Sequence, residues 1–380
     1  MPSAAYLDYN AGAPVRPQVI AAVAEVLASG GNPSSVHGWG RRIKAKIDQA
    51  RMEVARLVDA DSRGVVFTSC GTEANNMAVS GCGRARVLAS AIEHPSVIMA
   101  CPGADRIPVL PSGVVDLEAL DRMLGEDGSD ALVSVMWANN ETGILQPVEE
   151  VVRIAHAKGA LVHCDAAQAV GRVSVSVSDV GVDFLTLSGP KLGAPSGIGA
   201  FITKDPDFRV APMLLGGGQE RRRRAGTENV SGIVGLGCAA TIAEGEMQNR
   251  TAQTALRDLR DRLEADIMAR VPGARVIGPG QDRLDNTSCI CLPGVDAMTQ
   301  VMALDLAGVM VGAGSACSSG KMGKSAVLSA MGLDDAVVRS CIRVSLGWGS
   351  GPADVSKFLA AWTDLAGRKG FEVRAADAAA

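Results

Sequence analysis

The stretch Val182-Asp183-Phe184-Leu185-Thr186-Leu187-Ser188-Gly189-Pro190-Lys191 decides the fold class of this chain. It begins as an apolar run of strand length and turns, through a glycine and a proline, to a lysine. An earlier apolar run of similar length, at 160–165, ends in the carboxylate of Asp165. Polar side chains that follow apolar strands are typical of a parallel sheet, in which ligands bind beyond the carboxyl ends of the strands.

The same pattern extends outward on both sides of that stretch. Apolar runs of strand length alternate with longer runs of helical period, which predicts parallel strands joined by crossover helices. One such helix is predicted at 147–158, with proline in its first turn, and an earlier helical stripe is marked by Ile43, Ile47, Val54 and Leu57. We therefore expect an α/β domain with a mostly parallel, seven-stranded sheet, whose strands lie at 64–69, 86–92, 106–110, 131–138, 160–165, 182–188 and 198–203.

A second, smaller α+β unit is predicted after the glycines at 216–218. A long helical pattern from about 232 to 270 leads into it. Its strands are expected at 274–277, 286–292 and 341–346, and its helices at 297–306 and 352–368. We expect the large domain to span 14–255, while 1–13 and 256–380 form the small domain.

Composition excludes several classes of protein. The chain has 380 residues, of which 47% are hydrophobic, so it can bury a large core. A net charge of only -4 gives no indication of a nucleic-acid partner, and no apolar run is long enough to predict a membrane span. Nine cysteines without a disulfide-framework spacing, together with the absence of an export signal, favour the reducing cytoplasm.

Lys191 and Asp165 together indicate a cofactor. A lysine amine can bond covalently to the aldehyde of pyridoxal phosphate, and a carboxylate can hold the pyridine nitrogen protonated. A phosphate would suit the predicted helix start at Gly71 and Thr72, which offers backbone amides, a hydroxyl and the positive end of the helix dipole. Taken by itself, however, such a helix start is more often a simple cap.

Other polar residues also follow predicted strands. His94 could lie against a cofactor ring and move protons, or it could be a loop histidine bonded to a neighbour. Asn140, within 139–143, could reach the pyridine oxygen or belong to an ordinary turn. The triplet 163–165 contains histidine, cysteine and aspartate, but adjacent strand residues face opposite sides, so no metal site is predicted.

Three features of the second half of the chain carry open alternatives. Cys317 lies among small residues at 312–320, where an exposed thiolate could reach a substrate, and an inert thiol is the alternative. Arg343, inside a predicted apolar strand, needs a carboxylate, which could belong to a substrate or to a protein acid. The four arginines at 221–224 indicate either a solvated loop or a positively charged subunit boundary.

Taken in order, these motifs resemble the cysteine desulfurases of the NifS-like kind, which belong to the class V aminotransferase family with the type I pyridoxal-phosphate fold. The likeness covers nearly the whole chain, through segments 6–10, 32–37, 71–76, 93–94, 139–141, 165–168, 188–191 and 314–317 and residue 343.

The resemblance implies a role for each matching residue. Lys191 would bond to the cofactor, Asp165 would pair with its pyridine nitrogen, and His94 would stack on its ring. Gln168 and Asn140 would contact the ring oxygen. The phosphate would be bound by Gly71, Thr72 and Ser188, and by Thr227 from the other subunit of a homodimer. Asn32 and Arg343 would bind the carboxylate of L-cysteine, and Cys317 would attack the substrate sulfur.

The implied product is L-alanine together with a persulfide on Cys317, which would pass to an iron–sulfur scaffold or another sulfur-acceptor protein. One departure from the family is Pro190, where relatives usually carry a histidine that helps to hold the phosphate. Proline offers no hydrogen-bond donor, and an arginine from 221–224 could supply one in place of the histidine. The alternatives are a selenocysteine lyase, another enzyme of the class V aminotransferase type, and a weakly active scaffold relative.

Overall fold

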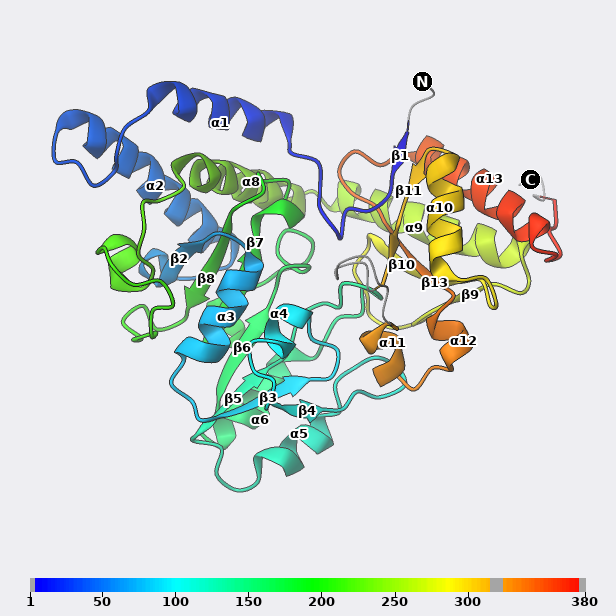
Figure 1. Ribbon diagram of the computed structural model, residues 1–380, viewed down its shortest axis with the longest axis horizontal. Helices are drawn as coiled ribbons and strands as arrows, with labels where there is room; N and C mark the ends of the chain where they lie inside the picture. Colours follow the sequence, from blue (N-terminus) through cyan, green and yellow to red (C-terminus); the bar gives the residue numbers. More distant parts are fainter. Residues whose placement is uncertain (1–3, 315–323, 376–380) are drawn as a thin grey trace.

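The computed structural model describes residues 4–314 and 324–375. Figure 1 shows two units side by side, each built around its own sheet, with the blue amino-terminal segment running from one to the other. Within the described ranges, no helix combines the length and the apolar character needed to cross a bilayer.

The larger sheet confirms the predicted α/β fold class. Its strand order is β2-β8-β7-β6-β5-β3-β4, and β8 runs in the direction opposite to the other six strands of this sheet. Each predicted strand is present, with ends that differ by a few residues: β2 (Val65–Thr68), β3 (Arg86–Ser90), β4 (Asp105–Ile107), β5 (Ala131–Ser134), β6 (Leu161–Asp165), β7 (Phe184–Ser188) and β8 (Gly199–Thr203).

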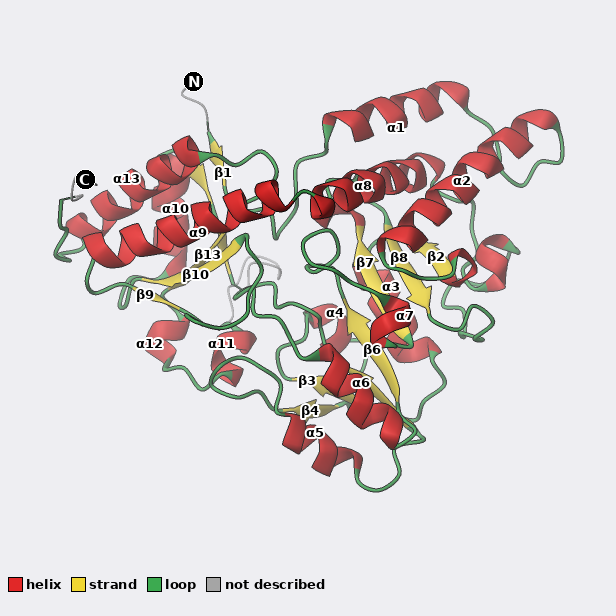
Figure 2. Ribbon diagram, turned by 180° about the vertical axis from the view of Figure 1, so that it is seen from behind, coloured by secondary structure: helices red, strands yellow, loops and turns green. Residues whose placement is uncertain are grey.

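Helices cover both faces of this sheet, which explains why most of its strand residues are apolar on both faces. Leu185 and Leu187 of β7 pack into one hydrophobic cluster, and Phe184 packs into another on the opposite face. Figures 1 and 2 show α3 on one face and α6 on the other. The helices of this unit are α1 (Pro17–Ser29), α2 (Gly38–Leu57), α3 (Gly71–Gly81), α4 (Pro95–Ile98), α5 (Leu117–Leu124), α6 (Val148–Ala157), α7 (Val177–Val180) and α8 (Val230–Gln248), with short 3-10 turns η1 (Ser62–Gly64), η2 (Gly189–Lys191) and η3 (Gln219–Arg222).

The second unit contains an antiparallel sheet in the order β12-β13-β10-β9 and a parallel pair formed by β1 and β11. The predicted helices α10 and α13 have the expected bounds, whereas the two-residue strands β1, β11 and β12 are too short to show a period. Its elements are β1 (Ala5–Tyr6), α9 (Arg250–Arg270), β9 (Arg275–Val276), β10 (Thr287–Cys291), α10 (Ala297–Leu306), β11 (Val309–Met310), β12 (Gly312–Ala313), α11 (Ala326–Ala330), α12 (Asp335–Val338), β13 (Cys341–Ser345) and α13 (Pro352–Arg368).

The helical pattern predicted from about 232 to 270 is present, but it is divided into two helices. Helix α8 ends at Gln248 and α9 begins at Arg250, because Asn249 between them has a non-helical ψ of 84°. The break lets α9 leave the large sheet and pack on the second one, where Leu263 and Ile267 are buried. The domain boundaries proposed at residues 14 and 255 stay a prediction.

Candidate active site

The predicted site residues His94, Asp165 and Lys191 meet at the carboxyl edge of the large sheet. His94 follows β3 and caps α4, Asp165 ends β6, and Lys191 ends the short turn after β7. Because β6 and β7 are parallel neighbours, their ends bring the carboxylate and the amine to the same edge. The three groups are close enough for the charges of Asp165 and Lys191 to act on the pKa of His94.

Asp165 is buried and held by two donors. Asn75 Nδ2, from helix α3, donates to its Oδ2 at 2.7 Å, and the backbone N–H of Ala167 donates to its Oδ1 at 3.0 Å. A carboxylate oriented in this way inside the protein is well placed to pair with a protonated ring nitrogen.

His94 is half-buried, and its ring orientation is set by Ser96. The backbone N–H of Ser96 donates to Nδ1 at 3.1 Å, and the Ser96 hydroxyl lies 2.7 Å from the same nitrogen. Burial is the main cause that lowers the pKa of His94, Asp165 acts in the opposite direction, and Lys191 lowers it further. The side chain is therefore a neutral imidazole near pH 7, with Nε2 left for chemistry.

The start of helix α3 forms an open cradle for an anion. Cys70 at the N-cap makes no side-chain hydrogen bond to the helix, so the first backbone amides, beginning at Gly71, are not capped. A Cβ atom at position 71 would lie 3.2 Å from the Cβ of Ser188, which shows how closely the two backbones approach. The Ser188 hydroxyl would lie 3.6 Å from the same added Cβ, and Thr72 is the second residue of the helix, so this end suits a phosphate.

Gln168 and Asn140 are joined through a residue that sequence reasoning did not single out, Asn10. Gln168 Nε2 donates to the backbone oxygen of Asn10 at 3.0 Å, and Asn10 Nδ2 donates to the backbone oxygen of Asn140 at 3.2 Å. Arg172, also missed, donates through Nη1 to both Gln168 Oε1 and Asn10 Oδ1 at 2.7 Å. The sequence signal that could have indicated Asn10 is its place as a polar residue directly after the short segment 5–9.

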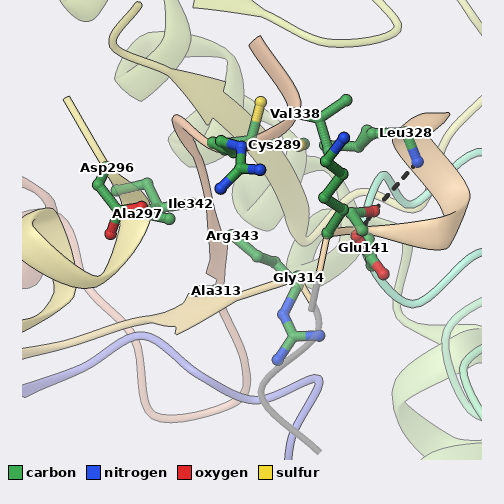
Figure 3. Close-up of a pocket in the computed structure, with 14 residues that line it drawn as sticks. Glu141, Cys289, Asp296, Ala297, Ala313, Gly314, Leu328, Val338, Ile342 and Arg343 are labelled. Atoms are coloured by element: carbon green, nitrogen blue, oxygen red, sulfur yellow. Dashed lines mark hydrogen bonds between the residues drawn. The ribbon is translucent and has the colours of Figure 1, made fainter. Parts of the chain in front are cut away.

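Arg343 does form a salt bridge to a protein acid. Its Nη2 lies 2.8 Å from Asp8 Oδ1, and its Nη1 donates to the backbone oxygen of Asn140 at 3.0 Å. The side chain is buried, and its Nε has no hydrogen-bond partner within the described residues. It lines a small pocket of about 60 Å³ together with Glu141 and Gly314, and Figure 3 shows these residues close to one another.

Three predicted site residues are not brought together with the others. Asn32 lies in the turn between α1 and α2, at the end of the molecule remote from β13 in both Figures 1 and 2, so one chain does not place it beside Arg343. Thr227 is exposed and lines a hollow of about 100 Å³ with Ser69. Cys317 lies outside the described residues.

The arginines at 221–224 are not simply a solvated loop. Arg223 is buried and donates to the backbone oxygen of Arg63, while Arg224 pairs with Glu73, in the first turn of α3, at 2.9 Å. An arginine, Arg224, therefore lies near the start of α3, where a histidine in place of Pro190 would be expected to help hold a phosphate. Its charge, however, is already matched by that of Glu73.

Known proteins resemble this chain over most of its length. Residues 5–358 match the model of the family described as "Aminotransferase class-V". A cysteine desulfurase of Cereibacter sphaeroides is 41% identical over 370 residues, which are 93% of this chain and 93% of that protein. Cysteine desulfurase NifS of Azotobacter vinelandii is 38% identical over 356 residues, 90% of this chain and 87% of that protein. The solved structure of a NifS-like protein from Rickettsia africae has a TM-score of 0.88 at 33% identity and covers 95% of this chain and 99% of that one.

Proposed function

Since the chain belongs to the class V aminotransferase family, we infer that it is a cysteine desulfurase that uses pyridoxal phosphate and converts L-cysteine to L-alanine. The observation that carries this function is the meeting of Asp165 and Lys191 at the ends of adjacent strands, on the sheet edge that also presents the uncapped start of α3. A buried carboxylate, an amine and an anion cradle fit this cofactor.

When bound, pyridoxal phosphate supplies an electron sink for the electrons left at the substrate Cα. We propose that Lys191 would hold the cofactor and that its Nζ would accept the Cα proton of the substrate. Asp165 would hold the pyridine nitrogen in its protonated form, which would strengthen the electron sink. His94 would stack on the ring and move protons through Nε2, because Nδ1 already accepts from the backbone N–H of Ser96.

The remaining assignments are also part of this proposal. Gly71, Thr72 and Ser188 bind the phosphate, and the Nε2 of Gln168 and the side chain of Asn140 contact the ring oxygen. Support comes from the close approach of Gly71 to Ser188 and from the shared contacts of Gln168 and Asn140 with Asn10.

We propose that Cys317 takes the sulfur atom. Its thiolate attacks the substrate Sγ, the Cβ–Sγ bond breaks, and Cβ gains a proton to become the methyl group of alanine. One L-cysteine and one enzyme thiol thus yield one alanine and one enzyme persulfide. Support comes from the described residues on either side of this segment, because the Ser325 hydroxyl donates to Glu141 Oε2 at 2.6 Å and Gly314 packs against the same carboxylate, beside Asn140.

Substrate binding and assembly follow from the same assignments. Arg343 would bind the substrate carboxylate by releasing Asp8, and Asn32 would act on the same group only from a second copy of the chain. We therefore propose a homodimer, in which Thr227 also reaches the partner's phosphate site. Both Asn32 and Thr227 are exposed, as such roles require.

The persulfide must pass to an acceptor, and we propose an iron–sulfur scaffold or another sulfur-acceptor protein, in keeping with the NifS relatives. We place the protein in the cytoplasm. The eight cysteines within the described ranges are free thiols, which suits a reducing compartment.

The test is turnover of L-cysteine by purified protein supplied with pyridoxal phosphate. We expect alanine and, with a reductant, sulfide. Cys317→Ala should abolish sulfide release and keep the visible absorbance of the bound cofactor, whereas the matched thiol control Cys238→Ala should retain both. Full activity of Cys317→Ala would refute the sulfur-carrier role. Dependence on an amino-group acceptor, or strong preference for selenocysteine, would favour the other enzyme classes, and failure to bind the cofactor would favour a scaffold.

A further inference from the structure

The surroundings of Arg172, which is half-buried and lines a cavity of about 470 Å³, are unusual for a guanidinium. Within residues 4–314 and 324–375, its hydrogen-bond acceptors are all neutral: Gln168 Oε1 and Asn10 Oδ1, each 2.7 Å from Nη1, and the backbone oxygen of Tyr9, 3.5 Å from Nη2. Burial, and to a lesser extent the positive charge of Arg343, lowers the pKa of Arg172 to about 10. The group is still a cation at pH 7, and its charge is not cancelled by the groups that it contacts.

Arginine has only donors, and this determines which way the Gln168 amide points. The oxygen of that amide must face Arg172, so its NH₂ group faces away from it. One Nε2 hydrogen is used by the backbone oxygen of Asn10 at 3.0 Å. The second hydrogen is left for a further acceptor. Had a carboxylate stood at position 172, the amide would have been turned to present an oxygen instead.

This inference rests on the proposed function, in which Gln168 contacts the ring oxygen of pyridoxal phosphate. We propose that Arg172 is a positioning residue that orients the Gln168 amide to donate from Nε2 to the cofactor ring oxygen. The Gln168 amide then lies between that oxygen and the positive charge of Arg172. Donor and charge act together, since both favour the anionic form of the ring oxygen and so the deprotonated form of the cofactor.

The first test is a pH titration of the visible absorbance of the bound cofactor, which measures protonation and not turnover. Arg172→Met should raise the pKa of this absorbance change by about one unit, because a charge and an oriented donor are lost. Arg172→Lys should return it most of the way. The matched control is Arg16→Met, which removes another half-buried arginine, one that pairs with Glu246 at 2.6 Å and donates to the backbone oxygen of Leu192 and not to Gln168.

The second test is cofactor affinity. Arg172→Met should weaken the binding of pyridoxal phosphate by about tenfold, and it should have little effect on an analogue that lacks the ring hydroxyl. Gln168→Glu provides an independent variant if Arg172→Met does not fold, because it keeps the arginine and replaces the donor with an acceptor. It should raise the absorbance pKa as well.

The outcomes separate the two proposals. Wild-type protein that binds no pyridoxal phosphate overturns the proposed function. Wild-type protein that binds it, with an absorbance pKa and an affinity that Arg172→Met leaves unchanged, overturns the role of Arg172 alone. Equal weakening of the cofactor and of the analogue without the hydroxyl would also overturn it, because the effect would then not pass through the ring oxygen.

Discussion

At the scale of single residues, Glu93 is a buried acid directly before His94. Its Oε1 accepts from the Ser90 hydroxyl at 2.7 Å and from the backbone N–H of Met136 at 2.6 Å, and thereby ties the end of β3 to the segment after β5. Burial is the main cause that raises the pKa of Glu93 from 4.5 to about 8. We therefore expect the native protein to hold this side chain protonated at pH 7.

This predicts a pH dependence of stability. In the unfolded chain the carboxyl ionises above 4.5, whereas in the folded chain it ionises only above about 8, so its contribution is complete below the first value and is lost as the pH rises through the second. Glu93→Gln keeps both acceptor bonds and cannot ionise. Urea unfolding at about pH 5 and about pH 9 should show a smaller loss of stability for the variant than for the wild type, by up to a few kcal/mol. Equal losses would contradict the burial of an acid at this position.

At the scale of elements, the junction between α3 and β7 determines the anion cradle. Position 71 has no room for a branched side chain, because even a Cβ would meet Ser188 at 3.2 Å. Gly71→Val should push the helix start away from β7 and weaken cofactor binding by at least about tenfold, which absorbance titration with pyridoxal phosphate would measure.

The matched control for this change is Gly245→Ala on α8, where an added Cβ meets nothing within 4 Å. It should leave cofactor affinity unchanged and stabilise its helix slightly, because alanine is the better helix former. Unaltered affinity of Gly71→Val would show that the phosphate does not bind at this helix start.

At the scale of the whole molecule, Asn10 joins the two units. Its Nδ2 donates to Thr287 Oγ1 of β10 at 3.0 Å, and its Oδ1 accepts from Arg172, in the large unit, at 2.7 Å and from Asn286 Nδ2 at 3.2 Å. The residue is only 1% exposed. Its loss would leave several buried polar groups without partners.

Asn10→Ala should therefore lower the free energy of unfolding by roughly 2–4 kcal/mol, measured by urea denaturation. The comparison variant is Gln49→Ala, whose exposed side chain donates to Glu53 on the same helix, α2. This variant should change stability by less than about 0.5 kcal/mol. Similar small losses for both variants would show that Asn10 does not couple the units.

Local patterns in the sequence were sufficient for the large sheet and for the positions of His94, Asp165 and Lys191. Each of these residues follows its own apolar strand, and a parallel sheet brings such strand ends to one edge, so position along the chain already implied position in space. The family resemblance added the roles. The short strands were not predicted, because a strand of two residues shows no hydrophobic period. The break between α8 and α9 was not predicted, because the residue between them is Asn249 and not a proline or glycine.

Only the tertiary structure decided how this edge is completed. Asn10 is hydrogen-bonded to Gln168, which is 158 positions away in the sequence, and to Thr287, which is 277 positions away. Arg343 forms its salt bridge with Asp8, which is 335 positions away. Hydrogen bonds between such distant residues leave no periodic trace in a sequence, because any donor and any acceptor satisfy the same chemistry until folding selects one pair. For that reason the edge of the sheet could be predicted, whereas the network that holds Gln168, Asn140 and Arg343 around it could not.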